Sequence, residues 1–245
     1  MHLVKRSEFG WGLSAAPHAN LNKGLVIHYD GPGLNLTHKP HSACIAYWKA
    51  IRIFHMRSHG WLDIGYSYGA CPHGFVFEGR GVDKQQAAEP GGNSSYYSCT
   101  LMLGDGEVPL STQIEATREL HKWLMDVHGN ASTVKGHRDF NSTSCPGSIL
   151  YKMVQDGTFK KAPFTKPIGK DWPYAKDTLM QKGWTHSEGV TKVQERLNAL
   201  GYSPALSVDG DFGQKTFDAV VWFQKKNHLS PDGIVGKLTW AALFN

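Results

Sequence analysis

The chain has 245 residues, of which 40% are hydrophobic and 19% charged. This composition is typical of a globular protein, and the length allows one well-buried domain together with a smaller one. Every apolar run falls short of the ~18 to 20 residues that a membrane-spanning helix needs, and the N-terminal stretch has no continuous apolar core. We therefore expect no stable membrane insertion and no secretory signal peptide.

The formal net charge is +5 and the pI is about 8.9. A basic protein of this kind suits an anionic polymer, such as a nucleic acid, a membrane surface or a bacterial cell wall. The Lys and Arg residues are scattered and form no dense basic helix, so we expect no nucleic-acid partner.

The N-terminal part of the chain alternates predicted strands and helices. Leu25–Tyr29 is a buried strand that a Gly-Pro-Gly turn ends, and residues 42–56 have helical spacing. Thr112 and Glu115 form a capping-box pattern at the start of a second helix. Further strands are expected on both sides of a turn at Pro72–Gly74, in "YYSCTLMLG" and in "STVKGH". The pattern predicts an α/β fold with a central sheet flanked by helices.

The chain changes character after about residue 155. Residues 156–186 are rich in Lys, Pro and Gly and are expected to connect two domains, 1–155 and 187–245. In the second domain, "VDGDFGQKTFDAV" at 208–220 matches "PDGIVGKLTWAAL" at 231–243, an offset of 23 residues. This repeat of a turn and a helix predicts a small helical domain with pseudo-symmetry, and we expect an all-α domain of three helices. We expect its core to contain Trp222, Phe223, Trp240 and Leu243, and its Asp-Gly turns to shape a groove.

The four cysteines are too sparse for a disulfide scaffold. Cys44, Cys71 and Cys99 lie in apolar stretches and are expected to be buried, reduced thiols. Cys145 differs, because it begins a Cys-Pro-Gly turn in a polar loop that follows His137 by eight residues.

Two histidines and this cysteine could form a metal site. Taken singly, His28 and His137 are each better explained as hydrogen-bonded core histidines. Together with Cys145 they make a three-ligand zinc set that leaves a fourth position for water.

Other histidines compete for the same role. His55 and His59 have helical spacing but lack the glutamate of an HExxH motif, so a solvated helix end is the better interpretation. His38 and His41 flank a proline and carry little weight.

Several motifs occur in order along residues 20–152: "VIHYD", "HGWLDIGYSY", "GFVFEGRG", "NSSYYSCTLMLG" and "GHRDFNSTSCPGSILY". They resemble the zinc N-acetylmuramoyl-L-alanine amidases of the phage lysozyme and peptidoglycan-recognition-protein family. Residues 189–243 resemble the helical peptidoglycan-binding domain found on many wall hydrolases. The resemblance implies a mixed central sheet and bacterial peptidoglycan as the partner.

The same resemblance implies roles for single residues. His28, His137 and Cys145 would bind Zn²⁺, and Tyr66 would hold the attacking water or the developing oxyanion. Thr143 occupies a position where many phage members carry a lysine, so its help to the transition state would be a hydrogen bond. A second departure is the loop "AAEPGGN" at 87–93, where relatives often have a histidine. Arg138 and Asp139 would orient His137.

The implied reaction is hydrolysis, by zinc-activated water, of the amide between N-acetylmuramic acid and the L-alanine of the stem peptide. Two alternatives stay open: a non-catalytic peptidoglycan receptor, and a zinc peptidase that cuts within the stem peptide. The presence of Cys145 favours an enzyme. Two wall-directed domains without a signal peptide suggest a phage endolysin, monomeric, made in the host cytoplasm and acting on the wall after release at lysis.

Overall fold

The computed structural model describes residues 1–163 and 179–244. The chain divides into two compact units, of which the first contains Met1–Pro109 and Gln113–Pro163 and the second contains the C-terminal helices. No helix within the described residues is long and apolar enough to cross a membrane. The first unit is an α/β domain and the second is helical, as the sequence predicted.

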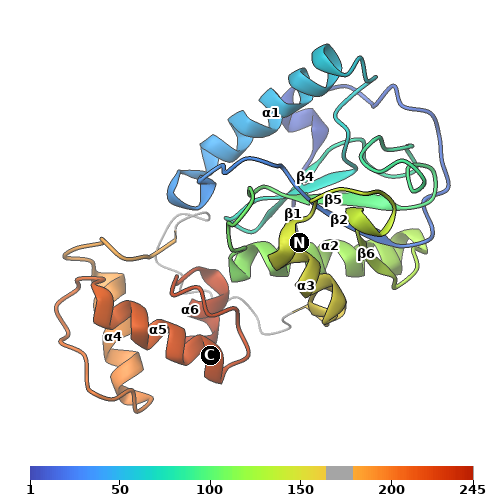
Figure 1. The fold of residues 1–245 in the computed structure, drawn as a ribbon. Coiled ribbons are helices and arrows are strands. Elements are labelled where there is room, and N and C mark those ends of the chain that lie inside the picture. The colour runs from blue at the N-terminus through green and yellow to red at the C-terminus, as the bar shows by residue number, and fades with distance from the viewer. Residues whose placement is uncertain (164–178, 245) are drawn as a thin grey trace. The chain divides into compact units, whose positions relative to one another are not determined.

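A six-stranded sheet forms the centre of the first unit (Figure 1). Its strands run in the order β1-β4-β3-β5-β2-β6, and each neighbouring pair is parallel except β3 with β4. The sheet is therefore mixed. The strands are β1 (His2–Val4), β2 (Leu25–Tyr29), β3 (Tyr68–Ala70), β4 (Phe75–Glu78), β5 (Tyr97–Leu101) and β6 (Val134–Gly136). The sequence predicted each of these except β1, whose three residues are too few to show an alternating pattern.

Helices cover both faces of this sheet (Figure 1). α1 (His41–Ser58) packs on one face, while α2 (Ser111–His128) and α3 (Gly147–Gln155) pack on the other. Four short 3₁₀ helices complete the unit: η1 (Arg6–Phe9), η2 (Leu36–His38), η3 (His137–Asp139) and η4 (Thr158–Lys160).

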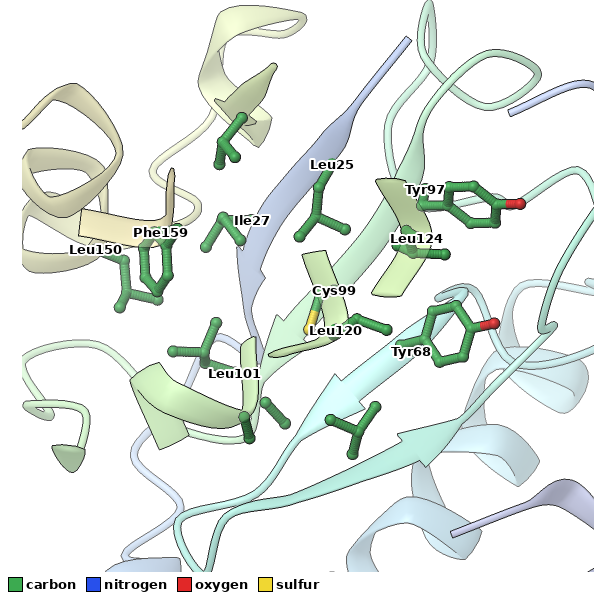
Figure 2. Close-up of a cluster of buried hydrophobic side chains, with 14 of the residues drawn as sticks. Leu25, Ile27, Tyr68, Tyr97, Cys99, Leu101, Leu120, Leu124, Leu150 and Phe159 are labelled. Carbon is green, nitrogen blue, oxygen red and sulfur yellow. The ribbon is translucent and has the colours of Figure 1, made fainter. Parts of the chain in front are cut away.

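The strand residues divide between two hydrophobic cores. Because successive side chains of a strand point to opposite faces, Leu25 and Ile27 face α2 and α3, whereas His28 faces the other way. Figure 2 shows the first core, in which Leu25 and Ile27 lie with Leu120, Leu124 and other buried side chains.

The second core lies under α1. Its centre is Trp48, a fully buried side chain that packs with Cys44, Cys71 and Phe77. A Cβ on Gly69 of β3 would lie 2.6 Å from the Trp48 ring. The close approach of α1 to the sheet therefore depends on a glycine at that position. Cys44, Cys71 and Cys99 are all buried and unpaired by disulfides, as expected.

Over residues 179–244 the second unit contains α4 (Glu188–Ala199), α5 (Gln214–Lys226) and α6 (Lys237–Phe244). Phe223, Trp240 and Leu243 are buried in its core, as predicted, whereas Trp222 is only partly buried at its edge.

Two buried glutamines hold the repeated Asp-Gly turns. Gln194 Nε2 donates to Asp209 Oδ1 at 2.8 Å, and Gln224 Nε2 donates to Asp232 Oδ1 at 2.7 Å. Each buried amide thus supplies hydrogen bonds that polar groups of the turn would otherwise need from water. The glutamines do not share the 23-residue offset of the turns, so the sequence repeat did not reveal them. That the turns shape a groove stays a prediction.

Folded structure extends into both ends of the predicted connector, 156–186. Phe159 is buried in the core of the first unit, and Met180 is buried in the second, where it pairs with Val235. The rest of the predicted connector includes residues 164–178, which lie outside the described residues.

Candidate metal centre

The register of β2 and β6 brings two of the predicted ligands together. Ile27 of β2 pairs with Gly136, the last residue of β6, in a parallel ladder, so His28 and His137 are the residues that follow this pair. Their ring centroids are 4.7 Å apart. Cys145 comes from the loop before α3, and its Sγ lies 3.6 Å from His28 Nδ1. One ligand atom from each of the three residues lies within 4.8 Å of the others.

Hydrogen bonds hold the loop that carries Cys145. The backbone N–H of Cys145 donates to Thr143 Oγ1 at 3.2 Å, and Arg138 donates to the Ser144 carbonyl. Asp139 accepts from the Gly136 N–H at 2.9 Å and from the Tyr151 hydroxyl at 2.6 Å. Arg138 and Asp139 thus support the segments on both sides of His137 and shape the loop.

The loop at 87–93 supplies a partner that the sequence did not reveal. Glu89 is fully buried, and its Oε2 lies 2.8 Å from His28 Nε2. With Nε2 donating to this carboxylate, the Nδ1 lone pair of His28 is directed toward Cys145. Such a carboxylate–histidine pair fixes the tautomer and orientation of a metal ligand.

The protonation of the three residues reflects their burial. Burial and the nearby charge of His137 lower the pKa of His28, and burial lowers the pKa of His137. Both imidazoles are therefore neutral at pH 7, as metal ligands must be. Burial raises the pKa of Cys145 to about 12, so binding of a metal would release its proton.

The buried Glu89 carboxylate behind His28, together with the ligand types, indicates that this site suits Zn²⁺. Burial raises the pKa of Glu89 well above its ordinary value, because a buried carboxylate lacks solvation. A cation on the other side of the His28 ring would offset that cost. Two imidazoles and one thiolate are ligands that zinc prefers, and three protein ligands are typical of a catalytic site.

A cavity of about 310 Å³ opens beside the three residues. Tyr66 and Thr143 both line it, as do His55 and Trp61. The Tyr66 ring lies 5.4 Å from the His28 ring, centroid to centroid. The structure therefore brings all five predicted site residues to one cavity.

Asp30 is a further member of this site that sequence reasoning missed. Its Oδ1 accepts from Thr100 Oγ1 at 2.8 Å, and burial raises its pKa to about 7 despite hydrogen bonds with Thr100, Tyr47 and Tyr66. Burial, together with the charge of Asp30, raises the pKa of Tyr66 well above 10. Tyr66 thus keeps its proton and can donate a hydrogen bond. The available signal was an acidic residue directly after the strand that carries His28.

The interpretation of His55 and His59 as a solvated helix end is correct for His59, which is exposed, and wrong for His55. His55 is buried, and its Nδ1 accepts from the Gly65 N–H at 3.0 Å. The loop that follows α1 folds back over His55, with the Trp61 ring 4.9 Å away, and this burial depends on tertiary contacts.

Known proteins resemble both units. Residues 186–243 match the family described as putative peptidoglycan binding domain. Peptidoglycan-recognition protein SC2 of Drosophila simulans is 32% identical over 169 residues, which cover 65% of this chain and 88% of that protein. A probable N-acetylmuramoyl-L-alanine amidase of Bacillus licheniformis is 27% identical over 241 residues, covering 90% of this chain and 66% of that protein. The solved structure of wild-type Drosophila PGRP-LB has a TM-score of 0.56 and 27% identity, covering 63% of this chain and 92% of that chain.

Proposed function

This chain belongs to the peptidoglycan-recognition protein family, and from that premise we propose that it is a zinc-dependent N-acetylmuramoyl-L-alanine amidase. It hydrolyses the amide between the lactyl group of N-acetylmuramic acid and the L-alanine of the stem peptide. The observation that carries the proposal is the convergence of His28, His137 and Cys145 at one cavity, with Glu89 directly behind His28.

His28, His137 and Cys145 would hold the zinc ion, which when bound polarises a carbonyl group and lowers the pKa of water. When it is ionised, Glu89 would accept from His28 Nε2 and so keep His28 in the tautomer that presents Nδ1 to the site. The loop between His137 and α3 fixes Cys145 through the Thr143 hydroxyl.

Tyr66 acts on the scissile carbonyl. Its hydroxyl stays protonated because burial and the charge of Asp30 raise its pKa. It can therefore donate a hydrogen bond to the oxygen on which negative charge develops, in place of its hydrogen bond with Asp30. Thr143 lines the same cavity, but its oxygen already accepts from the Cys145 N–H, so its contribution to the transition state is smaller than that of a charged lysine.

Two alternative functions are a peptidoglycan receptor without catalysis and a zinc peptidase. A non-catalytic peptidoglycan receptor needs no thiol at position 145, and the buried Glu89–His28 pair would then have no metal to orient. A zinc peptidase that cuts within the stem peptide would use the same ligands. The similarity to a probable amidase over 241 residues supports the amidase.

The C-terminal unit supports a role on the intact wall. Its match to a peptidoglycan-binding family, beside an amidase-like unit, fits a phage endolysin that acts as a monomer. In this proposal the protein is made in the host cytoplasm and reaches the wall when the cell lyses.

The test is mass analysis of peptidoglycan digested by the purified protein. The amidase releases intact stem peptides with a new L-alanine N-terminus, and the glycan strands keep their free lactyl groups. A peptidase leaves L-alanine on the glycan, and a receptor leaves the polymer intact. Cys145→Ala is the matched inactive variant.

A further inference from the structure

A second group of histidines and cysteines lies outside the proposed active site. His41 and Cys44 come from the first turn of α1, and Cys71 and His73 come from the turn between β3 and β4. One ligand atom from each of the four lies within 4.8 Å of the others. Cys71 Sγ is 3.7 Å from His41 Nδ1, and Cys44 Sγ is 3.5 Å from His73 Nδ1.

The local structure explains how each pair is presented. His41 and Cys44 are three residues apart on a helix, so their side chains share a face. Cys71 and His73 are on a tight turn, in which the Gly74 N–H donates to the Cys71 carbonyl at 3.0 Å. Gly74 has a φ of +81°, which glycine adopts without strain.

We propose that His41, Cys44, Cys71 and His73 bind a structural Zn²⁺ ion. Two thiolates and two imidazoles are a ligand set that selects zinc and completes a tetrahedral site. Ligands ~2.1 to 2.3 Å from a tetrahedral ion lie roughly 3.6 Å from one another. The two sulfur–nitrogen distances of 3.7 and 3.5 Å match that spacing.

The surroundings indicate a closed, structural site. Both thiols are fully buried against Trp48 and Phe77, and four protein ligands leave no position for substrate.

The ion would join two elements that no strand pairing connects. α1 contacts the sheet through Trp48 and carries His55 at its other end, where it lines the proposed active site. A metal at the first turn of α1 would hold the helix to the β3–β4 hairpin, so the site would contribute to stability without taking part in catalysis.

The experiment is a zinc count by native mass spectrometry on the full-length protein. The expected count rests on the proposed function, which assigns one zinc ion to His28, His137 and Cys145. Wild type should therefore hold two ions. Cys145→Ala should hold one, and Cys71→Ser should also hold one. The matched control is Cys99→Ser, a buried free thiol outside both groups, which should keep two.

A second measurement does not depend on folding of the Cys71 variant. Cys145→Ala lacks the catalytic thiolate, so a thiolate-to-metal charge-transfer band after Co²⁺ loading must come from Cys44 and Cys71. Absence of that band overturns the proposal, as does an equal zinc count in wild type and Cys71→Ser. A Cys44–Cys71 disulfide, found by mass mapping of protein alkylated before any reductant is added, overturns it too. Two ions in wild type with no cleavage of peptidoglycan would instead reject the proposed function alone.

Discussion

At His28 the two ring nitrogens have different partners, and this difference organises the site. Nε2 faces the buried Glu89 carboxylate at 2.8 Å, while Nδ1 faces Cys145 Sγ at 3.6 Å. A histidine buried on a strand would ordinarily be a costly choice. Here both nitrogens have partners, so the residue can serve as a ligand with a fixed tautomer.

Glu89→Gln should weaken zinc binding at the active site by ~10- to 100-fold, because a neutral amide is a poorer acceptor for the His28 N–H. Competition for zinc against a chromophoric chelator measures the effect. Glu119→Gln, which removes a partly exposed carboxylate elsewhere on the first unit, is the control. Equal zinc affinity in the Glu89 variant and wild type would reduce Glu89 to a packing residue.

Tyr66→Phe should retain zinc and lower kcat by ~10- to 1000-fold, because the variant lacks a hydrogen-bond donor to the developing oxyanion. Turnover of a soluble muropeptide and a parallel zinc count separate catalysis from metal loss. Tyr97→Phe is the control. It also removes a buried hydroxyl, but in the core between the sheet and α2, and it should leave kcat unchanged. Unchanged turnover in the Tyr66 variant would exclude its proposed role.

At the scale of single elements, α1 connects several features of the first unit. Its first turn carries His41 and Cys44, its middle carries Trp48, and its last turn carries His55. Close packing of Trp48 on Gly69 sets the distance from the sheet. One helix therefore contributes His41 and Cys44 to the proposed structural zinc site and His55 to the cavity of the candidate active site.

The last turn of α1 should make stability depend on pH. Burial, followed by the charges of His59 and Arg80, lowers the pKa of His55 to about 4 from 6.5. Below pH 6.5 the unfolded chain binds a proton that the folded protein does not, so stability falls as the pH drops toward 4. Above pH 6.5 both states are neutral and the contribution is constant.

His55→Asn keeps an acceptor for the Gly65 N–H but cannot be protonated. We therefore expect the urea midpoint of the variant to fall less than that of wild type between pH 7 and pH 4.5. Other buried histidines, among them His28 and His121, retain part of the effect. The exposed His18→Asn should behave like wild type. A His55 variant with the full wild-type loss would contradict the assignment.

At the scale of the whole molecule, two units with separate cores divide the proposed work. The first contains the candidate metal centre, and the second contains the peptidoglycan-binding match. A tethered binding unit raises the effective concentration of a repeating polymer near the active site.

A chain ending at Pro163 should cleave small soluble muropeptides at close to the full-length rate. It should bind intact walls poorly and lyse them roughly tenfold more slowly or worse at limiting protein, because the tether is lost. Wall pull-down and turbidity assays measure the two effects. If the shortened chain binds walls as well as the full chain, the C-terminal unit is not the anchor.

The sequence by itself determined the fold class and the three candidate metal ligands, because both depend on patterns among residues close together in the chain or on residue type. Strand alternation and helical spacing predicted the α/β layers, and a short-range repeat predicted the helical unit. His28 and His137 taken singly resemble core histidines, but together with Cys145 in its polar Cys-Pro-Gly loop they form a three-ligand set that the sequence itself suggests.

Only the tertiary structure decided which distant residues meet. Nothing in the spacing of Glu89 links it to His28, and His41, next to a proline, carries little weight as a ligand from its sequence context. The packing of Trp48 on Gly69 brings the first turn of α1 to the β3–β4 turn, and the fold of the 87–93 loop buries Glu89. Such contacts depend on the shapes of surfaces that form only when the elements pack, so no local pattern encodes them.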